Sequence, residues 1–374
     1  MKTRRRFCML LLVCLLAPAQ ILCQEDQGAG GADGAGGVTL RECMENLTLK
    51  GDLLIRYSVL DLDNPVQDDE TLDRIQTRFR VGFTWKSAGD DWELGAGLAS
   101  GDLESTTTMD TWSEEDFFET GDIRLDYAYA SHYLGPATFI AGQQINPFKT
   151  SWLLWDADVR PAGFTLRVDP GALFVTAGGY DVIQREEDFG ILYAVQAGMG
   201  ISAQDAGITL ALAYYDFDSD FEREYRPNPD YEYNIVDLFA GADARLGDIG
   251  LTVYGQVFEN IGAEGRAGEG VLGGGLDPEE ENMGWAAGIE ISLLRFTLEY
   301  TYAELGADAF VAGLTDATFG SGVGESDVKG HIISLDFDVT ECFTVGGNVY
   351  IYEALERENE PEAVQYHAEL TYLF

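Results

Sequence analysis

The sequence predicts an all-β fold, namely a transmembrane antiparallel β-barrel of about 16 strands. Three observations predict it. The chain opens with an export signal, its later segments alternate apolar and polar residues over membrane-spanning lengths, and its connections alternate between short and long. We take these elements in order along the chain.

The N-terminus has the pattern of a secretory signal peptide. Four cations within the first six positions precede an apolar run from Phe7 to Leu16, and Ala17-Pro18-Ala19 follows. We expect cleavage after Ala19 or Cys23, so that residues 1–23 leave the mature protein. Lipidation of Cys23 is the less favoured alternative, because the preceding residues are not small. No later apolar stretch approaches the ~20 residues that a membrane helix needs.

The mature chain is predicted to be a short tail followed by one domain. Residues 24–45 are rich in Gly, Ala and acids without any periodicity, and we expect a flexible periplasmic tail there. Residues 46–374 would form the barrel. The net charge of −42 disfavours nucleic acid as a partner and favours cations, divalent metals or a saline habitat.

Period-two alternation dominates from Asn46 onward. In the first segment Leu47, Leu49, Leu53, Ile55, Tyr57 and Val59 share one face, and a second such segment runs over 75–85. The remaining strands are expected near 92–100, 122–133, 137–144, 163–169, 172–180, 191–201, 207–217, 233–245, 250–260, 284–292, 295–303, 327–339, 343–354 and 363–374. The total of 16 is even, so that a closed barrel begins and ends on the same side of the membrane.

The connections give an independent indication of a barrel. Short ones, such as 134–136 and 246–249, alternate with long ones at 101–121, 145–162, 218–232, 261–283 and 304–326. Outer-membrane barrels have short periplasmic turns and long external loops. A soluble β-sandwich gives no reason for this strict alternation.

The C-terminal strand is the most specific local signal. Val364, Tyr366, Ala368, Leu370, Tyr372 and Phe374 form one apolar face, and the chain stops at Phe374. A terminal aromatic residue on an alternating strand resembles the signal that the barrel-assembly machinery of the Gram-negative outer membrane reads. We therefore expect outer-membrane localisation, with lipid around the barrel.

A barrel wall separates lipid from water, which assigns the side chains to two faces. The cations share one phase and are expected on the wall of a wet lumen; they are Lys50, Arg56, Arg78, Arg80 and Arg124. Aromatic girdles at the two interfaces are expected from Tyr57, Trp85, Tyr127, Tyr129, Trp285, Tyr300, Tyr302, Tyr372 and Phe374.

Residues 46–180 resemble the bacterial "putative porin" family of Gram-negative porins. The residues that carry the resemblance are 51–57, 78–82, 98–101, Asp126-Tyr127-Ala128-Tyr129, Gly142-Gln143-Gln144-Ile145-Asn146-Pro147-Phe148, Trp155-Asp156 and Pro161-Ala162-Gly163. The resemblance implies a water-filled channel for passive diffusion of small hydrophilic solutes and ions, and assembly as a homotrimer. The chain is more acidic than the family leads us to expect.

The connection after the fifth strand occupies the position where general porins fold a loop into the lumen. It contains Lys149, Asp156, Asp158 and Arg160, which would face the cationic wall residues and set charge selectivity at a pore constriction. The alternative is an external loop packed around Trp152 and Trp155.

Other functions find less support. The three histidines lie on different strands without a nucleophile motif, so we expect no enzyme activity, no cofactor and no metal site. Acidic loop runs such as 277–281 lack the ligand spacing of a calcium loop. A substrate-specific channel for an anion or an oligosaccharide remains an alternative, because an arginine ladder favours anions. A structural or adhesive barrel is less favoured.

Two cysteines remain after the signal peptide. Cys43 lies just before the first strand, and Cys342 lies in the turn between strands 14 and 15. Closure of the barrel would bring both to one periplasmic rim, about two interstrand spacings or roughly 10 Å apart. The sequence therefore predicts a disulfide between them in an oxidising compartment.

Overall fold

The computed structural model describes residues 46–63, 70–101, 107–113, 121–184, 189–218, 227–357 and 362–374. The predicted signal peptide, the tail at 24–45 and Cys43 lie outside these residues. Within the described ranges there is no helix that is long and apolar enough to cross a membrane.

The described residues form strands that follow one another along the chain. These are β1 (Leu47–Asp63), β2 (Glu70–Lys86), β3 (Trp92–Ser100), β4 (Asp110–Thr111), β5 (Ile123–Leu134), β6 (Ala137–Gln143), β7 (Ala162–Val168), β8 (Leu173–Gln184), β9 (Phe189–Ala203), β10 (Ala206–Phe217), β11 (Asn234–Leu246), β12 (Ile249–Asn260), β13 (Met283–Leu293), β14 (Phe296–Leu305), β15 (Val328–Thr340), β16 (Phe343–Ala354) and β17 (Glu362–Leu373).

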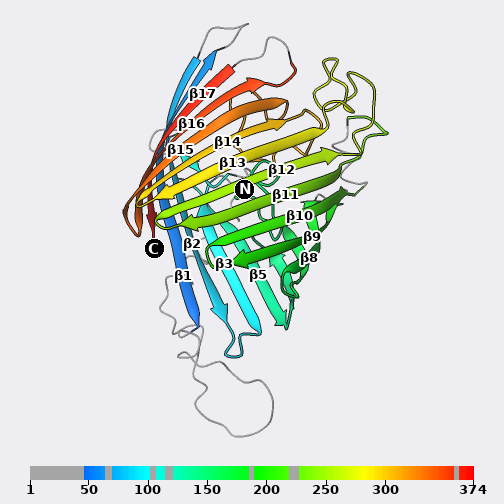
Figure 1. The fold of residues 1–374 in the computed structure, drawn as a ribbon. Helices are drawn as coiled ribbons and strands as arrows, with labels where there is room; N and C mark the ends of the chain where they lie inside the picture. Colours follow the sequence, from blue (N-terminus) through cyan, green and yellow to red (C-terminus); the bar gives the residue numbers. More distant parts are fainter. Residues whose placement is uncertain are drawn as a thin grey trace, which may run out of the picture.

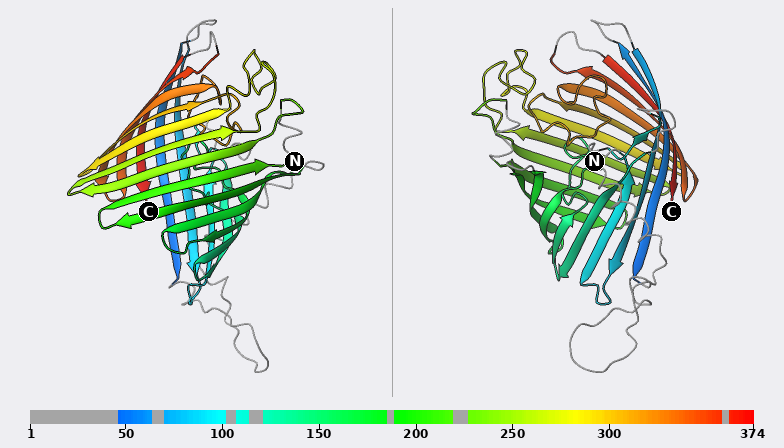
Figure 2. Two further views of the ribbon diagram at one scale, coloured as in Figure 1. Left: turned by 45° about the vertical axis from the view of Figure 1, so that its right-hand side comes forward. Right: turned by 180° about the vertical axis from the view of Figure 1, so that it is seen from behind.

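The strands close into one antiparallel barrel (Figures 1 and 2). Of the 17 strands, β4 pairs only with two residues of β2, which leaves 16 in the wall. Consecutive wall strands pair with each other, and β17 pairs with β1 from Asp52↔Leu373 to Asp63↔Glu362. The predicted fold class and strand count are confirmed.

Short turns and long loops lie at opposite ends of the barrel, as expected. Leu134↔Ala137 and Leu246↔Ile249 close two-residue turns, and Gly135 and Gly247 take positive φ angles of 62° and 65° there. A residue without a Cβ adopts this conformation without strain. The β1–β2 and β8–β9 hairpins extend further toward the long-loop end than predicted.

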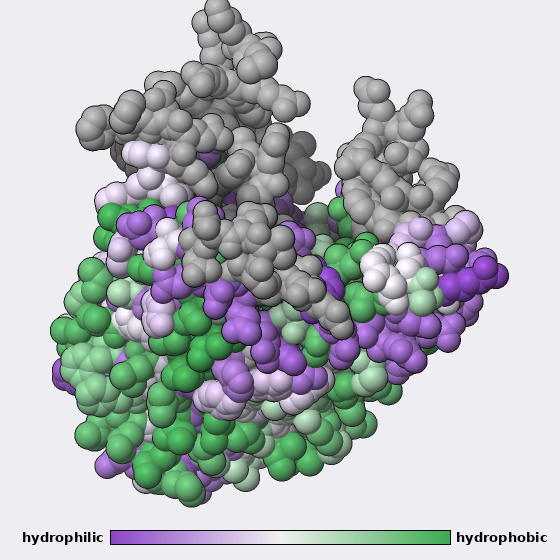
Figure 3. Space-filling model, turned by 90° about the horizontal axis from the view of Figure 1, so that it is seen from above, coloured by the Kyte–Doolittle hydropathy of each residue, from purple (hydrophilic) through white to green (hydrophobic). Residues whose placement is uncertain are grey.

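The outer face of the barrel is apolar. Leu49, Phe79, Leu212 and Leu298 expose between 37% and 62% of their surface on outward positions. Seen from the long-loop end, hydrophobic residues gather on the flank of the barrel and hydrophilic residues over the part that faces the viewer (Figure 3). The buried hydrophobic cluster, in contrast, lies inside the barrel. The loops that supply it define the candidate site.

Candidate functional site in the barrel lumen

The β6–β7 loop (residues 144–161) folds into the barrel, and the prediction of an in-folded loop after the fifth long strand is confirmed. Its apolar side chains Phe148, Leu153, Leu154 and Trp155 are buried. Phe148 and Trp155 pack against Tyr215 on β10, with ring centroids 5.5 and 6.5 Å apart. The alternative of an external loop is therefore wrong.

Buried amides of the far wall hold this loop. Gln196 on β9 accepts the Lys149 N–H at 2.8 Å and donates to its carbonyl at 2.9 Å. Gln256 on β12 accepts the Ser151 N–H at 2.7 Å and donates to Asp237 at 2.7 Å. Because these donors and acceptors are buried, each unmade bond would cost about 1–3 kcal/mol. The loop is thus fixed at a defined height in the lumen.

A second loop also enters the barrel, which the sequence analysis did not predict. The β14–β15 loop (residues 306–327) places Phe310 against Phe217 and Phe258, with ring centroids 6.2 and 6.0 Å apart. Phe319 packs edge-on against Tyr352 of β16 at 5.4 Å. The expected external loop at 304–326 instead fills the lumen, because it buries its aromatic residues there.

The two in-folded loops are joined directly. The Asp156 N–H donates to the Leu314 carbonyl at 2.7 Å, and the Asp316 N–H donates to the Trp152 carbonyl at 3.1 Å. The Ala317 N–H donates to the Asp156 carboxylate at 3.3 Å. We call this set the loop–loop contact.

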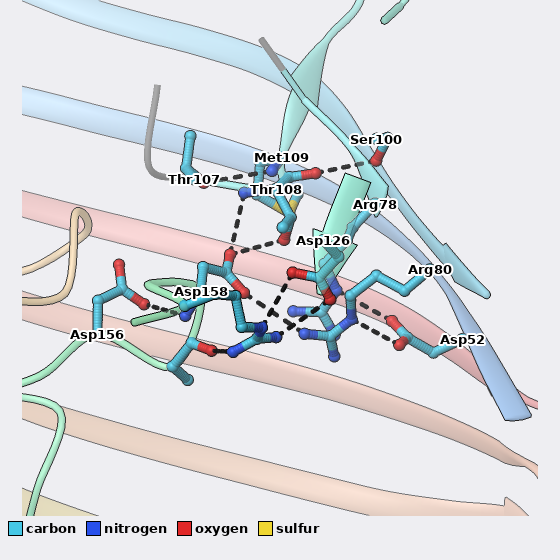
Figure 4. A network of polar contacts seen from close by, with 12 residues as sticks. Asp52, Arg78, Arg80, Ser100, Thr107, Thr108, Met109, Asp126, Asp156 and Asp158 are labelled. Atoms are coloured by element: carbon cyan, nitrogen blue, oxygen red, sulfur yellow. Dashed lines mark hydrogen bonds and ion pairs between the residues drawn. The ribbon is translucent and has the colours of Figure 1, made fainter. Parts of the chain in front are cut away.

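Asp158 ties the β6–β7 loop to the near wall (Figure 4). It accepts hydrogen bonds from the Thr108 N–H at 3.0 Å and hydroxyl at 2.6 Å, and it lies 3.4 Å from Arg80. Arg80 and Arg78 both pair with Asp52, at 2.7 and 3.0 Å. Burial would raise the pKa of Asp158, but the Thr108 hydrogen bonds and the nearby arginines outweigh it and lower that pKa.

The remaining predicted constriction residues do not form a single ring. Arg160 pairs with Asp126 of β5 at 3.0 Å. The Lys149 side chain is exposed. The hydrogen bonds to Gln196 described above involve only the backbone N–H and carbonyl of Lys149. Asp156 is 5% exposed at the loop–loop contact and does not pair with the wall arginines within the described contacts. The structure therefore brings together Asp158 with Arg78 and Arg80, but not all four loop charges.

The other predicted wall cations lie on inward positions. Arg56 pairs with Glu369 of β17 at 2.6 Å. Lys50 shares the inward phase of β1 with Asp52 and is exposed. Arg124 of β5 lies opposite Ala99 of β3.

Sequence reasoning missed a row of inward acids, which we call the acidic strip: Glu290, Glu299, Asp336 and Glu369. Glu290 and Glu299 are direct cross-strand partners, and Asp336 and Glu369 both lie opposite Gly346. Like charges in such positions destabilise a sheet. The sequence contained a signal for these acids, because each alternates in phase with the polar residues of its own strand, which predicts an inward position.

The prediction that Tyr127 and Tyr129 belong to an outer girdle is wrong. The β3–β5 register shifts between Gly97 and Leu98, so that β5 contains one extra residue. Tyr129 donates to Glu93 at 2.8 Å, and Tyr127 lies opposite Gly97 on the inward side. Tyr57, Tyr300, Tyr372 and Phe374 are exposed on the outer face as expected.

Among the described residues, no three His, Cys, Asp or Glu side chains are arranged to hold a metal ion. The site offers a cluster of paired charged side chains beside two packed loops.

Comparison with known proteins identifies the family. A family model described as "putative porin" matches residues 43–228. The chain belongs to this family. Pseudomonas putida OprB, in a high-pH structure, is similar in fold with 12% identity and a TM-score of 0.61, over 91% of this chain and 97% of OprB.

A second porin structure has a similar fold. Salmonella typhi OmpF, in a complex with daunomycin, has 13% identity and a TM-score of 0.57, over 89% of this chain and 99% of OmpF. No curated protein sequence matches the chain. The family and the fold point to a channel rather than to an enzyme.

Proposed function

We propose that this porin is a water-filled outer-membrane channel for passive diffusion of small hydrophilic solutes and ions, with a preference for cations. The observation that carries the proposal is the closed barrel with an in-folded loop, in a member of a porin family. Alternating lipid-facing and lumen-facing residues serve such a channel, because the wall meets lipid outside and water inside.

The cation preference rests on how the charges in the lumen are paired. Arg56, Arg78, Arg80 and Arg160 each lie within 3.0 Å of a carboxylate. Three members of the acidic strip, Glu290, Glu299 and Asp336, form no ion pair with a described cation. Unneutralised carboxylates raise the local concentration of cations.

Ion-reversal potentials test this proposal. Wild-type protein in planar lipid bilayers under a KCl gradient should prefer K⁺, and replacing Glu290 and Glu299 by Gln should lower the K⁺/Cl⁻ permeability ratio several-fold. The matched control replaces Asp277 and Glu279 in the β12–β13 loop by their amides and should change the ratio less. Equal effects from both pairs, or anion preference in wild type at low salt, would contradict the role of the strip.

The second candidate is a substrate-specific anion channel, based on the arginines of β1 and β2. The ion pairs of these arginines weaken it, because a neutralised guanidinium attracts anions less. The reversal potential separates the two: anion preference would favour the second candidate.

Further parts of the proposal concern biogenesis and assembly. We include removal of residues 1–23, homotrimer formation and recognition of Phe374 by the barrel-assembly machinery. The Phe374 ring is exposed on the outer face and stacks with Phe79 at 6.2 Å, which keeps the terminal aromatic accessible from outside. We also propose that charged residues of the β6–β7 loop set the charge selectivity of the channel. The main contributor is the pair of Asp158 and Arg80.

A further inference from the structure

We propose that Tyr127 and Tyr129 of β5 form a stacking surface on the inner wall that binds the ring of a neutral sugar. We call these two side chains the tyrosine platform. Tyr127 lies level with Gly82 of β2, two residues nearer to the short-turn rim than Arg80. The inference rests on the channel function proposed above and deepens it, because it names a class of solute and the wall that this solute contacts.

Glycines determine how the two rings lie on the wall. A Cβ at Gly95 of β3 would lie 2.5, 2.6 and 2.8 Å from the Cε1, Cζ and Oη atoms of Tyr129. A Cβ at Gly97 would lie 2.5 and 2.8 Å from Cε1 and Cζ of Tyr127, and a Cβ at Gly82 would overlap the same phenol. Such similar distances to bonded atoms place the face of each ring over the glycine backbone. Both side chains remain partly exposed, so the second face is turned to the lumen.

A carboxylate fixes the orientation of the platform. Glu93 of β3 accepts hydrogen bonds from the Tyr129 hydroxyl at 2.8 Å and from the Tyr133 hydroxyl at 3.1 Å. The Tyr129 ring therefore cannot turn its face away from the lumen without breaking a hydrogen bond. The ring centroids of Tyr127 and Tyr129 lie 5.9 Å apart with 37° between the ring planes, so the two faces adjoin. A surface that is already ordered loses little conformational entropy when a ligand binds.

The in-folded loops bury their apolar side chains against other parts of the wall. Among the described residues, the wall strands that contribute buried members to the apolar cluster are β1 and β8 to β17, and β2 to β7 contribute none. The inner face of β2, β3 and β5 carries the glycines, the tyrosine platform and the charged cluster around Asp158 instead. A solute that passes along this side of the lumen therefore meets the tyrosine rings.

Paired charges border the platform at both ends and favour a neutral ligand. Lys86 lies 3.6 Å from Glu93 toward the short-turn rim, and Arg160 lies 3.0 Å from Asp126, which precedes Tyr127. A pair of opposite charges offers hydrogen-bond donors and acceptors with little net charge, so it suits a solute rich in hydroxyl groups better than an ion. A pyranose ring combines such hydroxyls with an apolar C–H face that can cover an aromatic ring. Two adjoining tyrosine faces suit two linked sugar rings.

Current block by a sugar tests the platform. With full-length protein in planar lipid bilayers under KCl, the disaccharide cellobiose should reduce the current to a saturating level, and the acyclic polyol sorbitol should not. Tyr127→Leu keeps an apolar side chain without a flat ring and should raise the half-blocking concentration of cellobiose roughly three- to tenfold. Tyr300→Leu, on the outer face, is the control and should leave this concentration unchanged. Wild-type protein that conducts KCl but responds alike to both solutes would overturn the platform and leave the channel standing.

Saturation-transfer NMR gives a second measurement that does not depend on conductance. In micelles of a detergent without a sugar headgroup, irradiation of the aromatic protons of the protein should transfer saturation to the C–H protons of cellobiose. Tyr129→Phe keeps the ring and should retain the transfer, whereas Tyr129→Leu should reduce it. Equal transfer in these two variants would overturn the platform even if Tyr127→Leu failed to fold. Transfer in a wild-type protein that conducts no KCl would overturn the channel function but support the platform.

Discussion

Gln256 shows how one buried amide positions a whole loop. It lies on β12, is 4% exposed, and joins Ser151 and Thr150 of the β6–β7 loop to Asp237 of the neighbouring strand. An amide can accept and donate at once, and this position uses both abilities. An apolar residue of the same size would leave the Ser151 N–H and the Asp237 carboxylate without this partner.

Replacing Gln256 by Leu should therefore loosen the loop. We expect the barrel to lose about 1–3 kcal/mol of unfolding free energy, because buried polar groups are left unsatisfied. The unfolding temperature in detergent, followed by heat-dependent gel mobility, measures the loss. Protease sensitivity within residues 144–161 should rise in parallel. Gln204→Leu, at an exposed position in the β9–β10 turn, is the control, and equal unfolding temperatures for the two variants would contradict the role of Gln256.

At the scale of an element, β5 shows how one residue changes the face of a strand. Leu125 lies opposite Leu98 on the outside, but the extra residue Asp126 turns Tyr127 and Tyr129 inward. A shift by one residue exchanges the two faces of a strand. The sequence could not predict this, because Ile123, Leu125, Tyr127 and Tyr129 continue an unbroken alternation of large residues.

Glycines of β3 accommodate these inward tyrosines, which gives a prediction for the strand pair. A Cβ at Gly97 would overlap the Tyr127 ring, whereas a Cβ at Gly200 on β9 would meet open space. Gly97→Ala should destabilise the barrel by about 1–3 kcal/mol through overpacking. Gly200→Ala should be close to neutral. Equal unfolding temperatures for the two variants would show that the Tyr127 ring moves aside at no cost.

The strands could be predicted from the sequence and the β14–β15 loop could not, for a physical reason. A wall between lipid and water requires alternation at every strand, so Leu47 to Val59 already indicates its two faces. Residues 306–327 contain five glycines and many small polar residues, which is typical of exposed loops. Phe310 and Phe319 follow no period there, because their partners Phe258 and Tyr352 are distant in the chain.

At the scale of the candidate site, the residue types were predictable and their pairing was not. Asp158, Arg78 and Arg80 were expected near each other, and they are. Asp156, only two residues from Asp158, was expected beside them but lies at the loop–loop contact. The direction of a loop side chain depends on the turn that precedes it, which alternation does not determine.

At the scale of the whole molecule, the two ends of the barrel meet at the short-turn rim. Cys342 is exposed in the β15–β16 turn, and its carbonyl accepts the Leu373 N–H at 2.8 Å. The Asn46 carbonyl accepts the Lys86 N–H at 3.2 Å, which places the start of the described barrel on the same rim. Cys43 lies outside the described residues, so the disulfide with Cys342 stays a prediction.

Mass spectrometry of non-reduced protein isolated from outer membranes measures this bond. We expect a peptide pair that contains Cys43 and Cys342 and separates on reduction, because the exported compartment is oxidising. The Cys342→Ser variant is the control and should yield only the single peptides. Recovery of both cysteines as free thiols from wild type would refute the bond without affecting the barrel.

The pairing of the last strand with the first also sets an order in time. Residues 52–63 of β1 have their partners in residues 362–373, so Arg56 and Glu369 meet only after 313 positions of chain have been made. Until then β1 presents a row of unpaired N–H and C=O groups, which pairs readily with other chains. Contacts so distant in sequence also form slowly. Before the barrel closes, the chain must therefore be prevented from aggregating with other copies on the way to the membrane. Pairing of residues 362–373 with β1 removes the exposed strand edge.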